Sequence, residues 1–262
     1  MNIIATVKQV ADPNFSIGRI QLDPSGKRII SSFGVPPIIN GYDSNALEEA
    51  LQLRAKHGGR VTVLCVGDDS SRQALKRAIA MGADNAVLIN EPEWLNADSA
   101  GLGYILAAAI RKIGLYDLIL CGRQASDTDA GQVLFWIADA LQLPVMSPIS
   151  KVEESTSSHL TIRRLTEEGH QRLRIKLPAV IGISSEINEP RFPSIRGTSN
   201  ANRALIPGWK APDLGLKSIP VKVELQKLEI LSHSGHAEFI EATSPEEQGV
   251  ALANKLHELG LI

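Results

Sequence analysis

The chain has 262 residues, of which 44% are hydrophobic and 21% are charged, so it is long enough to bury a sizeable core. Its 27 lysines and arginines against 29 aspartates and glutamates give a formal net charge of −2, which excludes a bulk positive field that would attract nucleic acid or an anionic membrane. Cys65 and Cys121 each lie near the end of an apolar run without metal-ligand spacing, and we expect both to be buried and reduced. No apolar stretch approaches the roughly 18 residues of a membrane span, and the first residues lack the features of a secretion signal. These features indicate a cytoplasmic or organelle-matrix location, of which we expect the cytoplasmic one.

Four apolar runs in the first half of the chain alternate with helical patterns, which predicts an α/β fold with a parallel sheet and crossover helices. The expected strands are residues 3–10, 60–67, 85–90 and 116–122. The first expected helix has Asp43 or Ser44 as its N-cap and stops at Gly58 and Gly59, and further helices are expected over 70–83, 99–114 and 132–142. Residues 18–30 form two short alternating runs around DPSG, which predicts a β-hairpin inserted outside this alternation.

The second half of the chain changes from this alternation to consecutive β-like segments. These segments cover residues 147–154, 159–165, 170–177 and 179–185. Residues 188–220 are rich in Pro, Gly, Arg and Lys and are expected to be irregular, and a long irregular segment in a compact protein is usually functional or bound to a partner. We therefore divide the chain into an α/β nucleotide-binding domain (1–187), a recognition loop and linker (188–220), and a C-terminal arm (221–262) that ends in a helix opening at SPEE.

The segment GRQASDTDAG follows the fourth expected strand, at the edge of a parallel sheet where ligands bind. Gly122 lets the backbone turn close to a ligand, and Gly131 precedes a helix whose free N–H groups favour an anion. Gln124, Asp127 and Asp129 add hydrogen-bonding capacity. Two carboxylates beside a phosphate would repel it, so at least one of the aspartates should cap the helix or face a ribose hydroxyl or a positive group.

The sequence lacks the common catalytic motifs. It contains no G-x-S-x-G elbow, no Walker A motif and no G-x-G-x-x-G fingerprint. His233 and His236 are three residues apart, but no Cys or further His lies near them, which argues against a metal site. The residues alone therefore predict a nucleotide-binding α/β domain without a catalytic constellation, as is natural for a carrier or a binding subunit.

Five stretches occur in the order and spacing of a known family: NGYDSNALEEA, AMGAD, GRQASDTDAGQV, KLPAVIGIS and INEPRFPSI. Together they resemble the small (beta) subunit of the electron transfer flavoproteins over essentially the full length of the chain. The resemblance implies a Rossmann-like fold of the adenine-nucleotide-binding type, and a heterodimer with a larger alpha subunit that holds most of the FAD. It also implies that the C-terminal arm and helix pack on the alpha subunit.

The resemblance further implies a nucleotide site in this chain. Its residues come from two strand ends, the Asn before the first helix and the loop after the fourth strand: Thr6, Asn40, Val66, Gly122, Arg123, Gln124, Ala125, Asp127, Thr128, Asp129, Gln132 and Val133. Tyr42 occupies the aromatic position over the shared flavin. The family places either AMP or, in flavin-bifurcating members, a second FAD in this site; Gly131, where AMP-type members commonly have Asn, favours FAD.

The segment NEPRFPSI resembles the loop that docks on flavin dehydrogenases such as acyl-CoA dehydrogenases, with Ile195 as its apolar anchor between Arg191 and Arg196. The implied function is an electron carrier rather than an enzyme, which passes electrons from dehydrogenases through FAD to a downstream acceptor, with or without bifurcation. The alternative is a stand-alone adenine-nucleotide-binding regulatory or stress module without redox activity, which leaves residues 188–262 without a role. An adenylating enzyme would need a phosphate-gripping motif that the sequence lacks.

Overall fold

The computed structural model describes residues 1–14, 21–31, 34–230 and 237–262. The chain forms two compact units, Met1–Leu228 and Glu229–Ile262, and each is described by itself. The first residues of the expected hairpin and the pair His233 and His236 lie outside the described residues.

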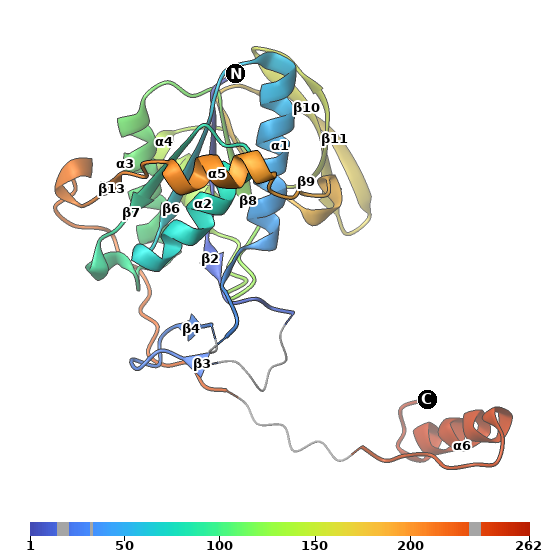
Figure 1. Cartoon of the computed structure of the whole chain (residues 1–262). Helices are drawn as coiled ribbons and strands as arrows, with labels where there is room; N and C mark the ends of the chain where they lie inside the picture. The colour runs from blue at the N-terminus through green and yellow to red at the C-terminus, as the bar shows by residue number, and fades with distance from the viewer. Residues whose placement is uncertain (15–20, 32–33, 231–236) are drawn as a thin grey trace. The chain divides into compact units, whose positions relative to one another are not determined.

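The first unit is built on a nine-stranded sheet in the order β11-β10-β9-β12-β8-β1-β6-β7-β13 (Figure 1). The strands are β1 (Ile3–Thr6), β6 (Val61–Val66), β7 (Asn85–Ile89), β8 (Leu118–Gly122), β9 (Val145–Ser155), β10 (His159–Thr166), β11 (Gly169–Lys176), β12 (Ala179–Ile183) and β13 (Gly208–Trp209). In the part of the sheet that runs β9-β12-β8-β1-β6-β7-β13, neighbouring strands are parallel. At the other end, β10 pairs antiparallel with both β9 and β11. This arrangement confirms the predicted α/β, Rossmann-like fold.

The first expected strand is interrupted. β1 ends at Thr6, and the chain then pairs through β2 (Gln9–Val10) with β5 (Ile38–Ile39) in a separate two-stranded ladder. The reason lies at Lys8, whose N–H donates to the Asp43 carboxylate at 2.8 Å instead of to a neighbouring strand. The single strand predicted over 3–10 is therefore wrong beyond its first half.

Helices cover both faces of the sheet (Figure 1). The helices α1 (Gly41–His57) and α2 (Arg72–Met81) pack on the face to which Ile3 and Ala5 of β1 point. On the opposite face, α3 (Ser99–Ile113) and α4 (Val133–Leu141) pack against Ile4 and its neighbours. Alternate residues of a strand point to opposite faces, so these short buried strands need both helical layers. The short 3-10 helices are η2 (Asp69–Ser71), η3 (Pro92–Trp94), η4 (Ser185–Ile187) and η5 (Pro212–Leu214).

The predicted β-hairpin is present between β3 (Gln21–Leu22) and β4 (Ile29–Ile30). Its turn is organised by Asp23, whose carboxylate accepts the backbone N–H groups of Lys27 and Arg28 at 2.9 Å each. A hydrogen bond from Ser25 lowers the pKa of Asp23 to about 2. The turn of the hairpin is therefore stabilised by hydrogen bonds from the backbone to an aspartate side chain, as the sequence DPSG predicted.

The segment 188–220 is more ordered than its composition predicts. It contains α5 (Ile195–Arg203), which packs against α2, and β13, which adds the last strand to the sheet beside β7 (Figure 1). Local propensity is weak here, because α5 reads IRGTSNANR, but tertiary packing overrides it.

The second unit contains α6 (Pro245–Glu258), the helix expected at SPEE. Ser244 is its N-cap, and the Ser244 hydroxyl accepts the N–H of Glu247 at 3.2 Å. None of the helices in the described part of the chain has the length and apolar character that crossing a membrane requires.

Candidate nucleotide-binding site

The order in which the chain adds strands to the sheet reverses at β1. From β1 the chain crosses through α1 to β6 on one side, and later returns through α3 to β8 on the other side of β1. In parallel α/β sheets this reversal leaves a crevice outside the carboxyl ends of the two strands, where ligands bind. Thr6 and Gly122 end these two strands, and Val66 ends β6 at the same edge.

Asn40 holds the loop that follows β8. It is completely buried at the start of α1; its Nδ2 donates to the Gln124 carbonyl at 2.8 Å, and its Oδ1 accepts the Ser126 N–H at 3.1 Å. The backbone N–H of Asn40 also donates to the Lys8 carbonyl at 2.9 Å. One amide therefore fixes the loop to the chain segment that leaves β1.

Asp43 lies buried between the ends of β1 and β8. Its Oδ2 accepts the Lys8 N–H at 2.8 Å, and its Oδ1 accepts the Gly122 N–H at 3.1 Å. Burial raises the pKa of Asp43 to about 7, against the opposing effect of these hydrogen bonds. The expectation that Asp43 or Ser44 caps the helix is wrong, because α1 begins at Gly41 and the Asp43 carboxylate joins two strand ends instead.

Sequence reasoning missed this role of Asp43, although a signal was present. Asp43 lies three, four and seven residues before Ala46, Leu47 and Ala50, which are all buried. This spacing places the carboxylate on the buried face of the helix. The same packing explains Gly122, where a Cβ would lie 2.3 Å from the Asp43 Oδ1 and 2.8 Å from the Tyr42 Cβ.

The two aspartates of the loop are bound within the site rather than capping α4. Asp127 pairs with the ammonium group of Lys8 at 2.7 Å, and Asp129 accepts the Gln124 side-chain amide at 2.8 Å. Asp129 and Gly131 both have a left-handed backbone, with φ of 47° and 61°. The α4 N-cap is Gln132, which makes no side-chain cap hydrogen bond, so the first N–H groups of the helix have no capping side chain. An uncapped helix start beside a tightly held loop is suited to an anion such as a phosphate.

Tyr42 and Arg123 lie against each other at this edge. The Arg123 guanidinium carbon is 5.2 Å from the centroid of the Tyr42 ring, and its Nε donates to the Gln124 side-chain carbonyl at 3.1 Å. Tyr42 is half-buried. An aromatic ring with a cation above it forms a platform on which a planar ligand can stack.

The structure thus brings most of the predicted site residues into one set of direct contacts. These residues are Asn40, Tyr42, Gly122, Arg123, Gln124, Ala125, Asp127 and Asp129, and Thr128 lies in the same turn, which the N–H groups of Thr128 and Asp129 close on the Ala125 carbonyl. Thr6 and Val66 reach the same edge through their strands, and Gln132 and Val133 open α4. The site is therefore a polar loop anchored to α1 across the switch point of the sheet.

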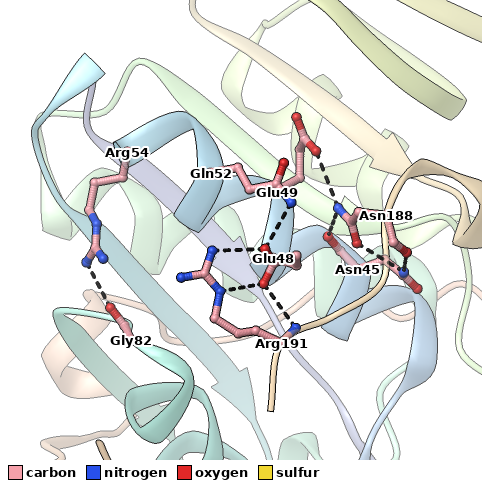
Figure 2. A network of polar contacts seen from close by, with 8 residues as sticks. All are labelled: Asn45, Glu48, Glu49, Gln52, Arg54, Gly82, Asn188 and Arg191. Atoms are coloured by element: carbon pink, nitrogen blue, oxygen red, sulfur yellow. Dashed lines mark hydrogen bonds and ion pairs between the residues drawn. The ribbon is translucent and has the colours of Figure 1, made fainter. Parts of the chain in front are cut away.

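The predicted docking residues lie on a different part of the first unit. Ile195, the first residue of α5, is 94% exposed, and Arg196 is also exposed. Arg191 is held by Glu48 of α1 through two hydrogen bonds, as Figure 2 shows. Phe192 is 87% exposed beside them and was not among the predicted docking residues, although it is a large apolar residue within the polar stretch NEPRFPSI.

The two cysteine thiols are not exposed at either of these places. Cys65 and Cys121 are both buried, as predicted, and burial raises the pKa of each thiol to about 12. Within the described ranges, no group of three or more His, Cys, Asp or Glu residues is arranged to hold a metal ion.

A family model described as the electron transfer flavoprotein domain matches residues 29–214 of the chain. The chain is 40% identical, over 231 residues, to the electron transfer flavoprotein subunit beta of Thermoanaerobacterium thermosaccharolyticum, which covers 85% of this chain and 86% of that protein. It is 31% identical to the caffeyl-CoA reductase-Etf complex subunit CarD of Acetobacterium woodii over the full length of both chains. It is also 36% identical, over 225 residues, to the protein FixA of Azorhizobium caulinodans, with 84% of this chain and 78% of that protein covered. The chain belongs to the electron transfer flavoprotein family, among its beta subunits.

Proposed function

We propose that this beta subunit holds a nucleotide of its own at the switch point of the sheet, while it shares a FAD with a larger alpha subunit in a cytoplasmic heterodimer. The observation that carries the proposal is the loop after β8, which Asn40 and Asp43 anchor beside the uncapped start of α4. Backbone N–H groups there would bind the phosphates, and Tyr42 with Arg123 would lie against the shared flavin. The redox chemistry belongs to the flavin, and the chain supplies position and access.

We infer that the second nucleotide is FAD rather than AMP. Gly131 supports this inference, because AMP-type members commonly have Asn at this position. Asn can also adopt the left-handed backbone of Gly131, so the backbone alone does not explain why Asn is absent here. The full-length likeness to a subunit of a caffeyl-CoA reductase-Etf complex points the same way, towards a flavin-bifurcating complex. In that case the heterodimer forms part of an oxidoreductase complex; otherwise it is a simple electron carrier.

The test is to co-express the chain with its alpha subunit, extract the nucleotides and count them per heterodimer. Two FAD per heterodimer would support the proposal, and one FAD with one AMP would contradict the second flavin while keeping the carrier function. A colourless chain that forms no complex with a larger subunit would contradict the carrier function itself and favour the stand-alone nucleotide-binding module.

We further propose that residues 188–220 dock on flavin dehydrogenases such as acyl-CoA dehydrogenases, and that residues 221–262 pack on the alpha subunit. The support for docking is the exposed pair Phe192 and Ile195, since large apolar side chains are rarely presented together to solvent without a partner. Replacing Ile195 with Ala should slow reduction of the heterodimer by its dehydrogenase and leave the flavin content unchanged. Equal kinetics of the variant and the wild type would contradict the docking role of Ile195.

A further inference from the structure

A buried polar network joins α1 to the start of the docking segment (Figure 2). Glu48 receives two hydrogen bonds from the Arg191 guanidinium, at 2.7 Å and 2.9 Å, and a third from the Arg191 backbone N–H at 3.2 Å. One turn earlier, the Asn45 side-chain amide donates to the Asn188 carbonyl at 2.7 Å, and Asn188 donates back to the Asn45 carbonyl at 3.2 Å. Both ends of the stretch 188–191 are thus attached to α1.

Glu48 is charged and inaccessible in this network. Its exposed fraction is 4%, whereas the Arg191 side chain is 43% exposed. Burial alone would raise the pKa of Glu48, but hydrogen bonds from Arg191 and Gln52 outweigh it and hold the pKa below its ordinary value. A bidentate arginine–carboxylate pair fixes direction as well as distance, so Glu48 orients the backbone at Arg191.

The chain is anchored again after residue 193, where α5 begins. The Ser194 hydroxyl accepts the Gly197 N–H at 2.9 Å and caps α5. At Gly197 the helix lies so close to α2 that a Cβ would stand 2.1 Å from the Ala80 carbonyl oxygen, and Ala201 is 2% exposed in the same contact. The first turn of α5 therefore rests on α2, while the preceding residues are attached to α1.

Two strongly exposed apolar side chains lie between these anchors. Phe192 is 87% exposed and directly follows the Arg191 anchor, and Ile195 is 94% exposed and directly follows the Ser194 cap. An apolar contact residue contributes more to binding when it is already held in place, because association then does not pay the free energy of ordering it. The network is placed to hold this pair in position.

We propose that Glu48 is a positioning residue for the docking of the electron-donating dehydrogenase, acting through Arg191 on the placement of Phe192 and Ile195. This inference rests on the proposed docking role of the segment 188–220. Glu48 itself is buried under Arg191, so any effect of Glu48 on the partner passes through the segment it holds. The competing explanation is that Arg191 contacts the partner directly and that Glu48 is only its local ion-pair partner.

The test measures KM and kcat for reduction of the intact heterodimer by an acyl-CoA dehydrogenase that reduces the wild type. Glu48→Gln keeps the size of the side chain and removes the charge, and it should raise KM about tenfold with little change in kcat. Ile195→Ala should raise KM by a similar factor. In the double variant the increase in KM should be smaller than the product of the increases in the two single variants, because an Ile195 that is already displaced contributes little to docking. If the two residues acted independently, the double variant would show the full product.

Matched variants separate positioning from general destabilisation. Glu153→Gln is the control, because Glu153 is also paired with two arginines, Arg163 and Arg172, but on β9. It should leave KM unchanged, and all variants should retain the wild-type FAD content. If Glu48→Gln yields no heterodimer, Asn45→Ala takes its place, since it loosens the same stretch and keeps the Glu48–Arg191 pair.

The outcomes are distinct. An unchanged KM for Glu48→Gln, factors that multiply in the double variant, or an increase in KM for Arg191→Gln without one for Glu48→Gln would each overturn the positioning role and leave docking intact. If neither Ile195→Ala nor Phe192→Ala changes KM, the docking proposal itself fails, whatever Glu48→Gln does. Coupling between the buried Glu48 and the exposed Ile195 would support the inference.

Discussion

Replacing Asp43 with Asn removes the carboxylate that lies between the ends of β1 and β8 and keeps its size. In the wild type this group accepts the Lys8 and Gly122 N–H groups, and burial raises its pKa to about 7, against about 3.9 for an aspartate in an unfolded chain. A carboxyl whose pKa is raised by folding contributes stability that is complete below its unfolded pKa. That contribution is lost as the pH rises through the folded pKa, because the folded protein must then ionise a buried group.

The two pKa values of Asp43 set the size of the effect. Between about pH 5.5 and about pH 8 the contribution of Asp43 to the free energy of unfolding should fall by about 2 kcal/mol. The asparagine side chain of the variant does not titrate, so the wild type should gain about 2 kcal/mol relative to Asp43→Asn on going from the higher to the lower pH. Other titrating groups are common to both proteins and cancel in this comparison.

The assay is urea unfolding of both proteins at the two pH values, followed by circular dichroism, with the slope of the transition checked for equality. The quantity of interest is the change with pH in the difference between the two free energies of unfolding. A difference that stays constant from about pH 5.5 to about pH 8 would refute the raised pKa, and with it the interpretation of Asp43 as a carboxyl that is half-protonated near neutral pH.

Three further substitutions test the loop after β8. Gly122→Ala places a Cβ 2.3 Å from the Asp43 Oδ1, so it should cost about 1–3 kcal/mol in urea unfolding and lower the extracted nucleotide per heterodimer. Asn40→Ala removes two partly buried hydrogen bonds to the loop backbone and should cost about 2 kcal/mol, again with nucleotide loss; unchanged nucleotide content would contradict its role as the loop anchor. Gly131→Asn keeps the left-handed backbone, and we expect stability within about 1 kcal/mol of the wild type but a shift from FAD towards AMP in the extract.

The fold was predictable from the sequence where the signals were local. Helical spacing and terminal glycines placed α1, α2, α3 and α4 close to their observed limits, and alternation placed the strands β6 to β12. The position of the loop after β8 was predictable for the same reason, because Gly122 and Gly131 lie at or next to the strand end and the helix start that the loop joins.

What the sequence did not predict depends on contacts between distant residues. The break after β1 depends on Asp43 taking the Lys8 N–H, 35 residues away, and the placement of Arg191 depends on Glu48, 143 residues away. Helix α5 was missed because Gly, Thr, Ser and Asn dominate its sequence, and its stability comes from the Ser194 cap and from packing on α2. Local patterns carry no information on such pairings, so they appear only when the fold brings the residues together.

The same helix holds both parts of the first unit for which we propose a function. The first turn of α1, with Asn40 before it and Asp43 in it, anchors the nucleotide loop, and the next turn, with Asn45 and Glu48, anchors the docking segment. Asp43 and Glu48 are about 7.5 Å apart along the helix axis, at a rise of about 1.5 Å per residue. Electron transfer depends on a reproducible separation between the donor and the flavin, and one rigid helix fixes that separation better than a flexible connection does. A substitution that tilts or frays this end of α1 should therefore impair nucleotide binding and docking together, whereas substitutions in α5 should affect docking alone.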